Sequence, residues 1–200
     1  MKIITLDEIS FDKFASTHKY RNYYQTSAYA KTIKNHGYDI HYIGIIDDLG
    51  NLIGASLLLY KEVFMNYKIA YAPRGFLFDY TNVNNLKELA SRLKKLLSKQ
   101  GFISVTIDPY LPVNIRDKDG KIMNINNEAN IALENLKASG FNYLGPNLFF
   151  ESKKPRFEAI VTLDNDIKDI YQSFEKRVRH KIKKAIRSCL LYTSDAADEL

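Results

Sequence analysis

The stretch from Phe102 to Pro112, FISVTIDPYLP, decides the fold that we predict for this chain. Its first residues are β-branched, aromatic or small, which are residue types that favour a β-strand. Proline cannot donate to a sheet ladder and holds the preceding residue extended, so the strand is predicted to end at Asp108. Open α/β sheets bind ligands at the carboxyl ends of their strands, which makes Asp108 a candidate functional residue. The alternative is that Asp108 only opens a turn, because Asp and Pro both favour turns.

The bulk composition is that of an ordinary globular protein, with 46% hydrophobic and 26% charged residues among 200. This length allows one domain, or one domain and part of a second. The formal net charge of +6 favours anionic partners. The single cysteine, Cys189, excludes an internal disulfide and a cysteine metal cluster, and the histidines lack metal-ligand spacing, so we predict no metal site.

The sequence shows no sign of membrane insertion or secretion. No apolar run reaches the ~18 residues that are needed to span a bilayer. Residues 1–7 lack the apolar region of a signal peptide. Together with the lone cysteine, these features predict a protein of the reducing cytoplasm.

Hydrophobic periodicity predicts the elements around the central strand. Helical spacing of apolar residues predicts helices over residues 7–16, 26–36, 84–99 and 127–139, and a last helix that begins at residue 165. Short apolar runs predict further strands over residues 3–6, 40–46, 52–60, 67–72, 141–144 and 156–163. Residues 114–120 are expected to form a polar loop.

This order of elements is that of an α+β, GNAT-like N-acyltransferase fold, with a mixed, largely antiparallel sheet flanked by helices. Most members of that class bind coenzyme A phosphates on a glycine-rich loop that opens a helix. No such Arg/Gln-x-x-Gly-x-Gly/Ala loop occurs here, and the nearest feature, Pro73-Arg74-Gly75, is too short. The sequence therefore argues against coenzyme A, and we expect no cofactor.

Several short segments occur together in an order and spacing that are typical of one family. They are Tyr24-Gln25-Thr26, Tyr71-Ala-Pro-Arg-Gly75 followed by Asp79-Tyr80, Ile107-Asp-Pro-Tyr-Leu-Pro112, Asp119-Gly120 and the basic segment 176–185. Taken together they resemble the Fem family (FemABX) of non-ribosomal peptidyltransferases, over about residues 2–187. FemA-like members of this family add glycines to the interpeptide bridge of peptidoglycan.

The resemblance implies an aminoacyltransferase that builds this bridge, with glycine as the expected amino acid. The donor would be aminoacyl-tRNA, and the acceptor an amine on the stem peptide of a lipid-linked peptidoglycan precursor. The amine would attack the ester carbonyl and give an amide. Such an enzyme would work in the cytoplasm, peripheral to the inner face of the plasma membrane. The sequence implies nothing about the oligomeric state.

The resemblance also implies a domain organisation, because family members have two GNAT-like subdomains. Residues 1–147 would form the first subdomain, and residues 148–188 only the opening strand and basic helix of the second. Residues 189–200 depart from the family pattern and resemble translated sequencing-adapter sequence, so we expect a non-native tail there. We therefore expect a fragment that is inactive alone.

The family pattern suggests roles for an acid and a lysine. Asp108 matches the family aspartate that is proposed to handle the acceptor amine. An alkylammonium group, with a pKa near ~10.4, must lose a proton before it attacks, and a carboxylate can orient the group or accept that proton. Lys34 lies near a family lysine that contacts acceptor phosphates, although Lys31 competes for this role. The alternative for Lys34 is an ordinary solvated lysine on a helix face.

Arginines and a further lysine complete the candidate anion-binding residues. Arg74 stands where the family has a basic residue before glycine at a strand end, and its fork suits phosphate or carboxylate. Alternatively, Arg74 pins its turn by pairing with Asp79. Arg177, Arg179 and Lys181 fall in the basic stretch, where they would meet precursor pyrophosphate or the tRNA backbone. The alternative for these residues is a solvated helix face.

Other functions stay open at this point. An acyl-CoA N-acyltransferase of the GNAT type has the same predicted fold, but the missing phosphate loop argues against it. A non-enzymatic RNA-binding module is suggested by the basic helix alone.

Overall fold

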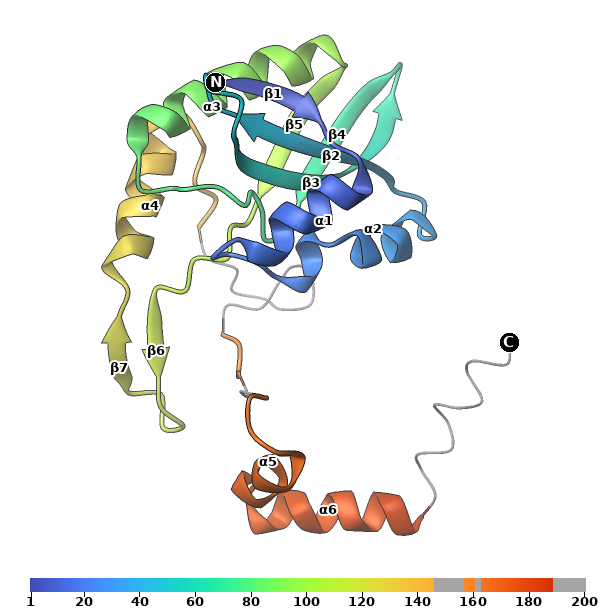
Figure 1. Ribbon diagram of the computed structural model, residues 1–200, viewed down its shortest axis with the longest axis vertical. Helices are drawn as coiled ribbons and strands as arrows, with labels where there is room; N and C mark the ends of the chain where they lie inside the picture. Colours follow the sequence, from blue (N-terminus) through green and yellow to red (C-terminus); the bar gives the residue numbers. More distant parts are fainter. Residues whose placement is uncertain (146–156, 161–162, 189–200) are drawn as a thin grey trace. The chain divides into compact units, whose positions relative to one another are not determined.

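The computed structural model describes residues 1–145, 157–160 and 163–188 of the chain. The chain divides into two compact units, Met1–Leu144 and Gly145–Leu200. The first unit is built around a five-stranded sheet in the order β1-β2-β3-β4-β5 (Figure 1). Its strands are β1 Lys2–Thr5, β2 Asp39–Ile46, β3 Leu52–Phe64, β4 Tyr67–Ala72 and β5 Phe102–Ile107.

Helices cover both faces of this sheet (Figure 1). One face carries α1 and α2, which are joined by a short 3₁₀ turn, and the other carries α3 and α4. Their bounds are α1 Glu8–Thr17, the 3₁₀ turn η1 Tyr23–Gln25, α2 Ser27–Lys34, α3 Val83–Lys99 and α4 Asn127–Ala138. The predicted α+β class, with a mixed, largely antiparallel sheet flanked by helices, is confirmed.

The helices begin where side chains can cap them. Asp7 accepts from Ser10 N at the start of α1, and Thr26 accepts from Tyr29 N at the start of α2. Such caps satisfy backbone N–H groups that have no partner within the helix. The Asp7 cap confirms the predicted start of the first helix.

The core lies on both faces because the strands alternate their side chains. Leu57 and Leu59 of β3 pack towards α1 and α2, whereas Leu58 between them packs towards α3. All of these side chains are buried, and full burial of one leucine contributes ~1.5–3 kcal/mol. β3 is therefore the central strand of both cores.

The last strand pair is parallel, and this decides where the candidate site lies. Strands β1 to β4 pair antiparallel, while β5 pairs parallel with β4 after the crossover helix α3. Tyr71 of β4 lies beside Thr106 of β5, and Ala72 lies beside Ile107. The carboxyl ends of both strands thus meet at the same edge of the sheet, with the turn at Pro73 next to Asp108.

The structure differs from the sequence predictions after β5. The expected polar loop is part of a two-stranded ribbon, β6 Asn114–Arg116 and β7 Ile122–Ile125. Its turn is closed by the side chain of Asp117, which accepts from Asp119 N and Lys121 N. Side-chain closure of this kind is a usual role of aspartate in turns.

The strands predicted over residues 141–144 and 156–163 are not found in the described residues. Residues 141–144 are not in a strand, because Phe141 N instead donates to Leu136 O and closes the end of α4. Residues 157–160 and 163 are not in a strand either. Residues 156, 161 and 162 lie outside the described residues.

The described part of the second unit consists mainly of α5 Ile167–Ser173 and α6 Lys176–Arg187, where the sequence predicts one helix. Asp166 caps α5 and accepts from Lys168 N. Phe174 has an extended conformation between the two helices. The predicted tail over residues 189–200 lies outside the described residues. Among the described helices, none combines the length and the apolar character needed to cross a bilayer.

Candidate functional site

The candidate site is built around Asp108, at the edge where β4 and β5 end. The Tyr71 hydroxyl donates to Asp108 Oδ2 at 2.9 Å, and the Arg74 backbone N–H donates to Asp108 Oδ1 at 2.6 Å. The Asp108 side chain is partly buried. Hydrogen bonds to a charged acceptor are shorter and stronger than neutral ones, so these contacts fix the direction of the carboxylate.

Tyr71 stays a hydrogen-bond donor at every ordinary pH. Burial raises the pKa of the Tyr71 hydroxyl, and the neighbouring negative charge of Asp108 raises it further. The alternation of β4 places Tyr71 on the face of the sheet that packs against α1 and α2. Tyr71 was not predicted as a partner of Asp108 from the sequence, although the motif Tyr71–Gly75 contains it.

The turn at residues 73–75 carries the other donor. Arg74 has a φ of +51°, a left-handed conformation that non-glycine residues adopt only where their surroundings impose it. Gln25 Nε2 donates to Pro73 O at 2.8 Å, and Asn22 Nδ2 donates to Arg74 O at 3.3 Å. Side chains from the segment before α2 therefore hold this turn.

The Arg74 guanidinium group lies over the ring of Tyr110. Its Cζ lies 5.7 Å from the centroid of the Tyr110 ring, a cation–π distance. Asp79, the alternative partner, accepts instead from Thr81 N at 2.9 Å and Thr81 Oγ1 at 2.7 Å. These two contacts of Asp79 lie within its own turn, and the pairing of Arg74 with Asp79 stays a prediction.

Tyrosines form a cluster next to Asp108. The Tyr24 and Tyr29 rings lie 5.1 Å apart, and Tyr23 lies 5.5 Å from Tyr29. Burial is the main cause that raises the pKa of Tyr29, and the charges of Tyr24, Tyr23 and Asp108 add to it. The charge of Asp108 thus acts on Tyr29 of this cluster. The tyrosine rings provide aromatic faces of the kind that bind an ammonium group.

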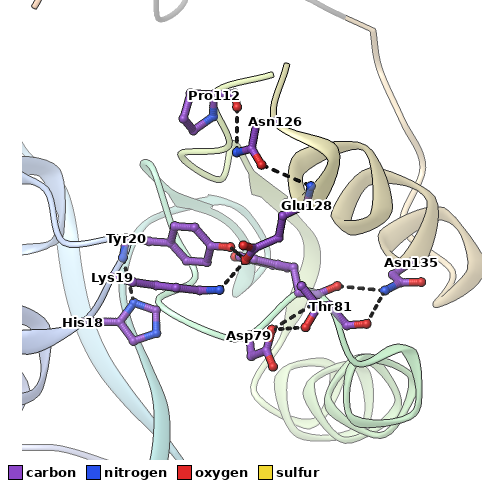
Figure 2. Close-up of polar contacts among 10 residues, drawn as sticks. His18, Lys19, Tyr20, Asp79, Thr81, Pro112, Asn126, Glu128 and Asn135 are labelled. Atoms are coloured by element: carbon purple, nitrogen blue, oxygen red, sulfur yellow. Dashed lines mark hydrogen bonds and ion pairs between the residues drawn. The ribbon is translucent and has the colours of Figure 1, made fainter. Parts of the chain in front are cut away.

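A second polar cluster anchors the segment between α1 and η1 to α4 (Figure 2). Glu128 Oε1 accepts from the Tyr20 hydroxyl at 2.8 Å and also from Lys19 Nζ. Asn126 caps α4 by accepting from Glu128 N at 3.1 Å. His18 Nδ1 accepts from Tyr20 N at 3.2 Å. Tyr20 is therefore held from both sides, only a few residues before Asn22 and Gln25.

Lys34 belongs to α2 and not to the strand ends that carry Asp108 and Arg74. It is exposed in the last turn of α2, and its side chain makes no hydrogen bond or ion pair in the described residues. Its competitor Lys31 forms an ion pair with Glu8 at 2.5 Å. Of the two lysines, Lys31 is thus the one whose side chain is already paired.

The other predicted cations lie on α6 of the second unit. Arg177 and Lys181 are exposed and make no ion pair in the described part of the chain. Arg179 is partly buried, and its Nη1 donates to Gln172 Oε1 at 2.7 Å. This contact ties α6 to α5, so part of the role of Arg179 is structural.

A groove of about 480 Å³ lies between α1 and the segment that leads into α2. Asp12, Arg21, Asn22 and Thr26 are among the residues that line it, and Asp108 is not. No group of three or more potential metal ligands occurs in the described residues. Asn22, which lines this groove, also donates to Arg74 O in the turn beside Asp108.

Comparisons with known proteins show what this chain is similar to. A family model described as the FemAB family matches residues 6–200. A lipid II:glycine glycyltransferase of Staphylococcus aureus is 29% identical over 179 residues, which are 88% of this chain and 39% of that protein. The crystal structure of FemX matches with a TM-score of 0.70 and 28% identity, over 93% of this chain and 44% of that chain. The chain spans about two fifths of the length of the curated relatives it matches.

Proposed function

Because the chain belongs to the FemAB family, we propose that it is part of an aminoacyltransferase that builds the interpeptide bridge of peptidoglycan. The similarity to a glycyltransferase that acts on lipid II supports glycine as the amino acid and a lipid-linked precursor as the acceptor. Aminoacyl-tRNA is the proposed donor, because its ester is activated for transfer. The proposed place of work is the cytoplasmic face of the membrane, where a lipid-linked acceptor is within reach.

The proposed reaction is attack of an amine on an ester. The nitrogen of the acceptor forms a bond to the carbonyl carbon of the aminoacyl group, and the bond from that carbon to the tRNA ribose oxygen breaks. The acceptor amine is an ammonium ion at neutral pH, so it must first lose a proton. The ribose oxygen gains a proton as it leaves.

Asp108 carries this proposal, because Tyr71 and Arg74 hold its carboxylate in one direction at a strand end. A fixed carboxylate can bind the acceptor ammonium and place its nitrogen for attack. Orientation is the role that we assign to Asp108, and transfer of the proton to water or to the leaving oxygen completes the step. The neighbouring tyrosine cluster would contact the same ammonium through its ring faces.

The anionic parts of both substrates require cations elsewhere on the chain. Lys34 is the proposed ligand of the acceptor phosphates, because it is exposed and makes no ion pair within the described residues. The exposed Arg177 and Lys181 of α6 are proposed to bind precursor pyrophosphate or the tRNA backbone, with Arg179 in support. Each neutralised phosphate adds affinity that decreases as salt increases.

The test is transfer of labelled glycine from glycyl-tRNA to lipid II by the protein made from the complete reading frame. We expect the 200-residue chain to be inactive alone, because it spans 39% of the glycyltransferase it resembles. In the complete protein, Asp108→Asn should lower the transfer rate by at least about 100-fold. Asp119→Asn, on an exposed turn, is the matched control and should leave the rate unchanged. An active Asp108→Asn protein, or no transfer by the unchanged protein, would overturn the proposal.

A further inference from the structure

Gln25 is a polar side chain whose place in the fold the proposed chemistry does not explain. It is fully buried, with 0% exposure, in the 3₁₀ turn between α1 and α2. A buried amide is costly unless its donors and acceptor are paired. Gln25 Oε1 accepts from Leu57 N at 2.8 Å, and Gln25 Nε2 donates to Pro73 O at 2.8 Å. The side chain therefore joins the central strand β3 to the turn beside Asp108.

Gly75 shows how closely this amide approaches the turn. A Cβ at residue 75 would lie 2.8 Å from Gln25 Nε2 and 2.8 Å from Ser56 Oγ, closer than real Cβ contacts occur. Only glycine therefore leaves room for Gln25 at this position. The turn and the buried amide therefore fit each other closely.

Side chains hold the polar backbone groups on both sides of the Arg74 α-carbon. Pro73 O accepts from Gln25, Arg74 N donates to Asp108 Oδ1, and Arg74 O accepts from Asn22 Nδ2. Arg74 is left-handed, with a φ of +51°, and such a residue relaxes when its surroundings no longer impose the conformation. Relaxation of φ at Arg74 would turn its N–H away from Asp108.

We propose that Gln25 and Asn22 are positioning residues that hold the Arg74 backbone so that its N–H fixes one oxygen of the Asp108 carboxylate. The role assigned to them is exerted on the Arg74 backbone and not on the substrates. Their effect reaches the reaction through the turn, by keeping the carboxylate in the direction in which it binds the acceptor amine. This inference rests on the proposed function for its catalytic consequence, while the effect on Arg74 can be measured without any substrate.

The first experiment uses the 200-residue chain and NMR of its backbone amides. Asn22→Ala removes the contact to Arg74 O, and Gln25→Met removes the contacts to Pro73 and Leu57. In both variants we expect the Arg74 amide proton to move upfield and to exchange faster, because its hydrogen bond to Asp108 lengthens. Amides in the middle of β2 should keep their shifts and exchange rates.

The matched controls are Asn84→Ala and Gln100→Met, which make the same chemical changes at exposed positions near the ends of α3. They should leave the Arg74 amide unchanged. If Gln25→Met does not fold, Asn22→Ala decides, because Asn22 is only partly buried. An Arg74 amide that behaves in Asn22→Ala as in the unchanged chain would overturn the inference. Exchange that accelerates equally at Arg74 and throughout β2 would overturn it too, because it would indicate a purely structural role.

The second experiment measures glycine transfer by the complete protein. Asn22→Ala should lower kcat by about tenfold to a hundredfold, the usual effect of misplacing a reacting group, and leave KM for tRNA unchanged. A change in the KM for tRNA with kcat intact would overturn the positioning role. Loss of the proposed function is distinguishable, because it would appear as an active Asp108→Asn protein while the Arg74 amide still responded to Asn22→Ala.

Discussion

The Tyr71 hydroxyl and the Asp108 carboxylate meet across the parallel strands β4 and β5, with 2.9 Å between the phenolic oxygen and Oδ2. The register of the parallel pair brings them together, because Tyr71 lies beside Thr106, two residues before Asp108. A parallel pair places both carboxyl ends at one edge of the sheet, whereas an antiparallel pair would have placed them at opposite edges. The contact between Asp108 and Tyr71 thus depends on the crossover through α3, which makes β4 and β5 parallel.

We predict that Tyr71→Phe lowers the rate of glycine transfer by the complete protein roughly tenfold to a hundredfold. The change removes a hydrogen bond to a charged acceptor, and such bonds contribute ~1.5–3 kcal/mol. The carboxylate then keeps the Arg74 N–H and loses the donor on its other oxygen. The measurement is kcat of glycine transfer to lipid II.

Tyr67→Phe is the control for this prediction, because Tyr67 lies in the same strand but is exposed. It should leave kcat unchanged. Equal rates for Tyr71→Phe and Tyr67→Phe would show that the hydroxyl beside Asp108 is not needed.

Many features of the first unit could be predicted from the sequence, because they depend on residues close together in the chain. Asp108-Pro109 ends β5 where proline requires it, and Asp7 caps α1 as predicted. The apolar runs on either side of residues 47–51 form the two strands predicted there, and these pair antiparallel as β2 and β3. Such features depend on residues that are neighbours in the chain, and one sequence contains that information.

The contacts that assemble the site could not be predicted in the same way. Gln25 reaches Pro73 across 48 residues, and Tyr71 reaches Asp108 across 37. Only the tertiary arrangement brings these pairs together. The ribbon of β6 and β7 was missed because the side chain of Asp117 closes its turn within a polar stretch. The break between α5 and α6 was missed because no glycine or proline marks Phe174.

We predict that Tyr42→Phe stabilises the chain. The Tyr42 hydroxyl is buried and has no hydrogen-bond partner among the described residues, while its ring stacks on Phe11 with centroids 4.7 Å apart. An unpaired buried hydroxyl costs about 1–3 kcal/mol, and phenylalanine keeps the ring contact. Thermal denaturation should show a higher Tm for Tyr42→Phe, and no change for Tyr67→Phe at an exposed position.

The same substitution should also reduce the loss of stability at alkaline pH. Burial raises the pKa of Tyr42 to about 12, above the ordinary value of 10.0. Between these values the unfolded chain loses this proton and the folded chain keeps it, so stability falls as the pH rises through this window. In Tyr42→Phe this loss disappears. A Tm of Tyr42→Phe below that of the unchanged chain at neutral pH would contradict the prediction.

We predict that His18 makes the chain less stable in mild acid. Burial lowers the pKa of His18, the positive charge of Lys19 lowers it further, and Asp79 opposes them. As the pH falls below about 6.5, the unfolded chain takes up a proton that the folded chain resists, so stability decreases. His18→Gln keeps an acceptor for Tyr20 N and removes the titration, so urea denaturation should show a smaller loss between about pH 7.5 and 5.5.

His36→Gln serves as the control for His18, because His36 is exposed beyond the end of α2. Its acid destabilisation should equal that of the unchanged chain. His41, whose pKa burial also lowers, should maintain part of the acid effect in His18→Gln. Acid destabilisation of the same size in His18→Gln and the unchanged chain would show that His18 contributes nothing.

We predict that the exposed cations of α6 contribute phosphate contacts when tRNA binds. The double substitution Arg177→Gln with Lys181→Gln should weaken binding and flatten the dependence of log K on log salt by about 0.7 to 0.9 for each lost phosphate contact. Fluorescence anisotropy of labelled tRNA over a series of salt concentrations measures this slope. Lys94→Gln with Lys95→Gln on the exposed side of α3 removes the same net charge and should change the slope less. Both double variants remove two positive charges, and they differ only in where those charges lie. Equal slopes for the two variants would therefore mean that α6 acts only through the net charge of the chain.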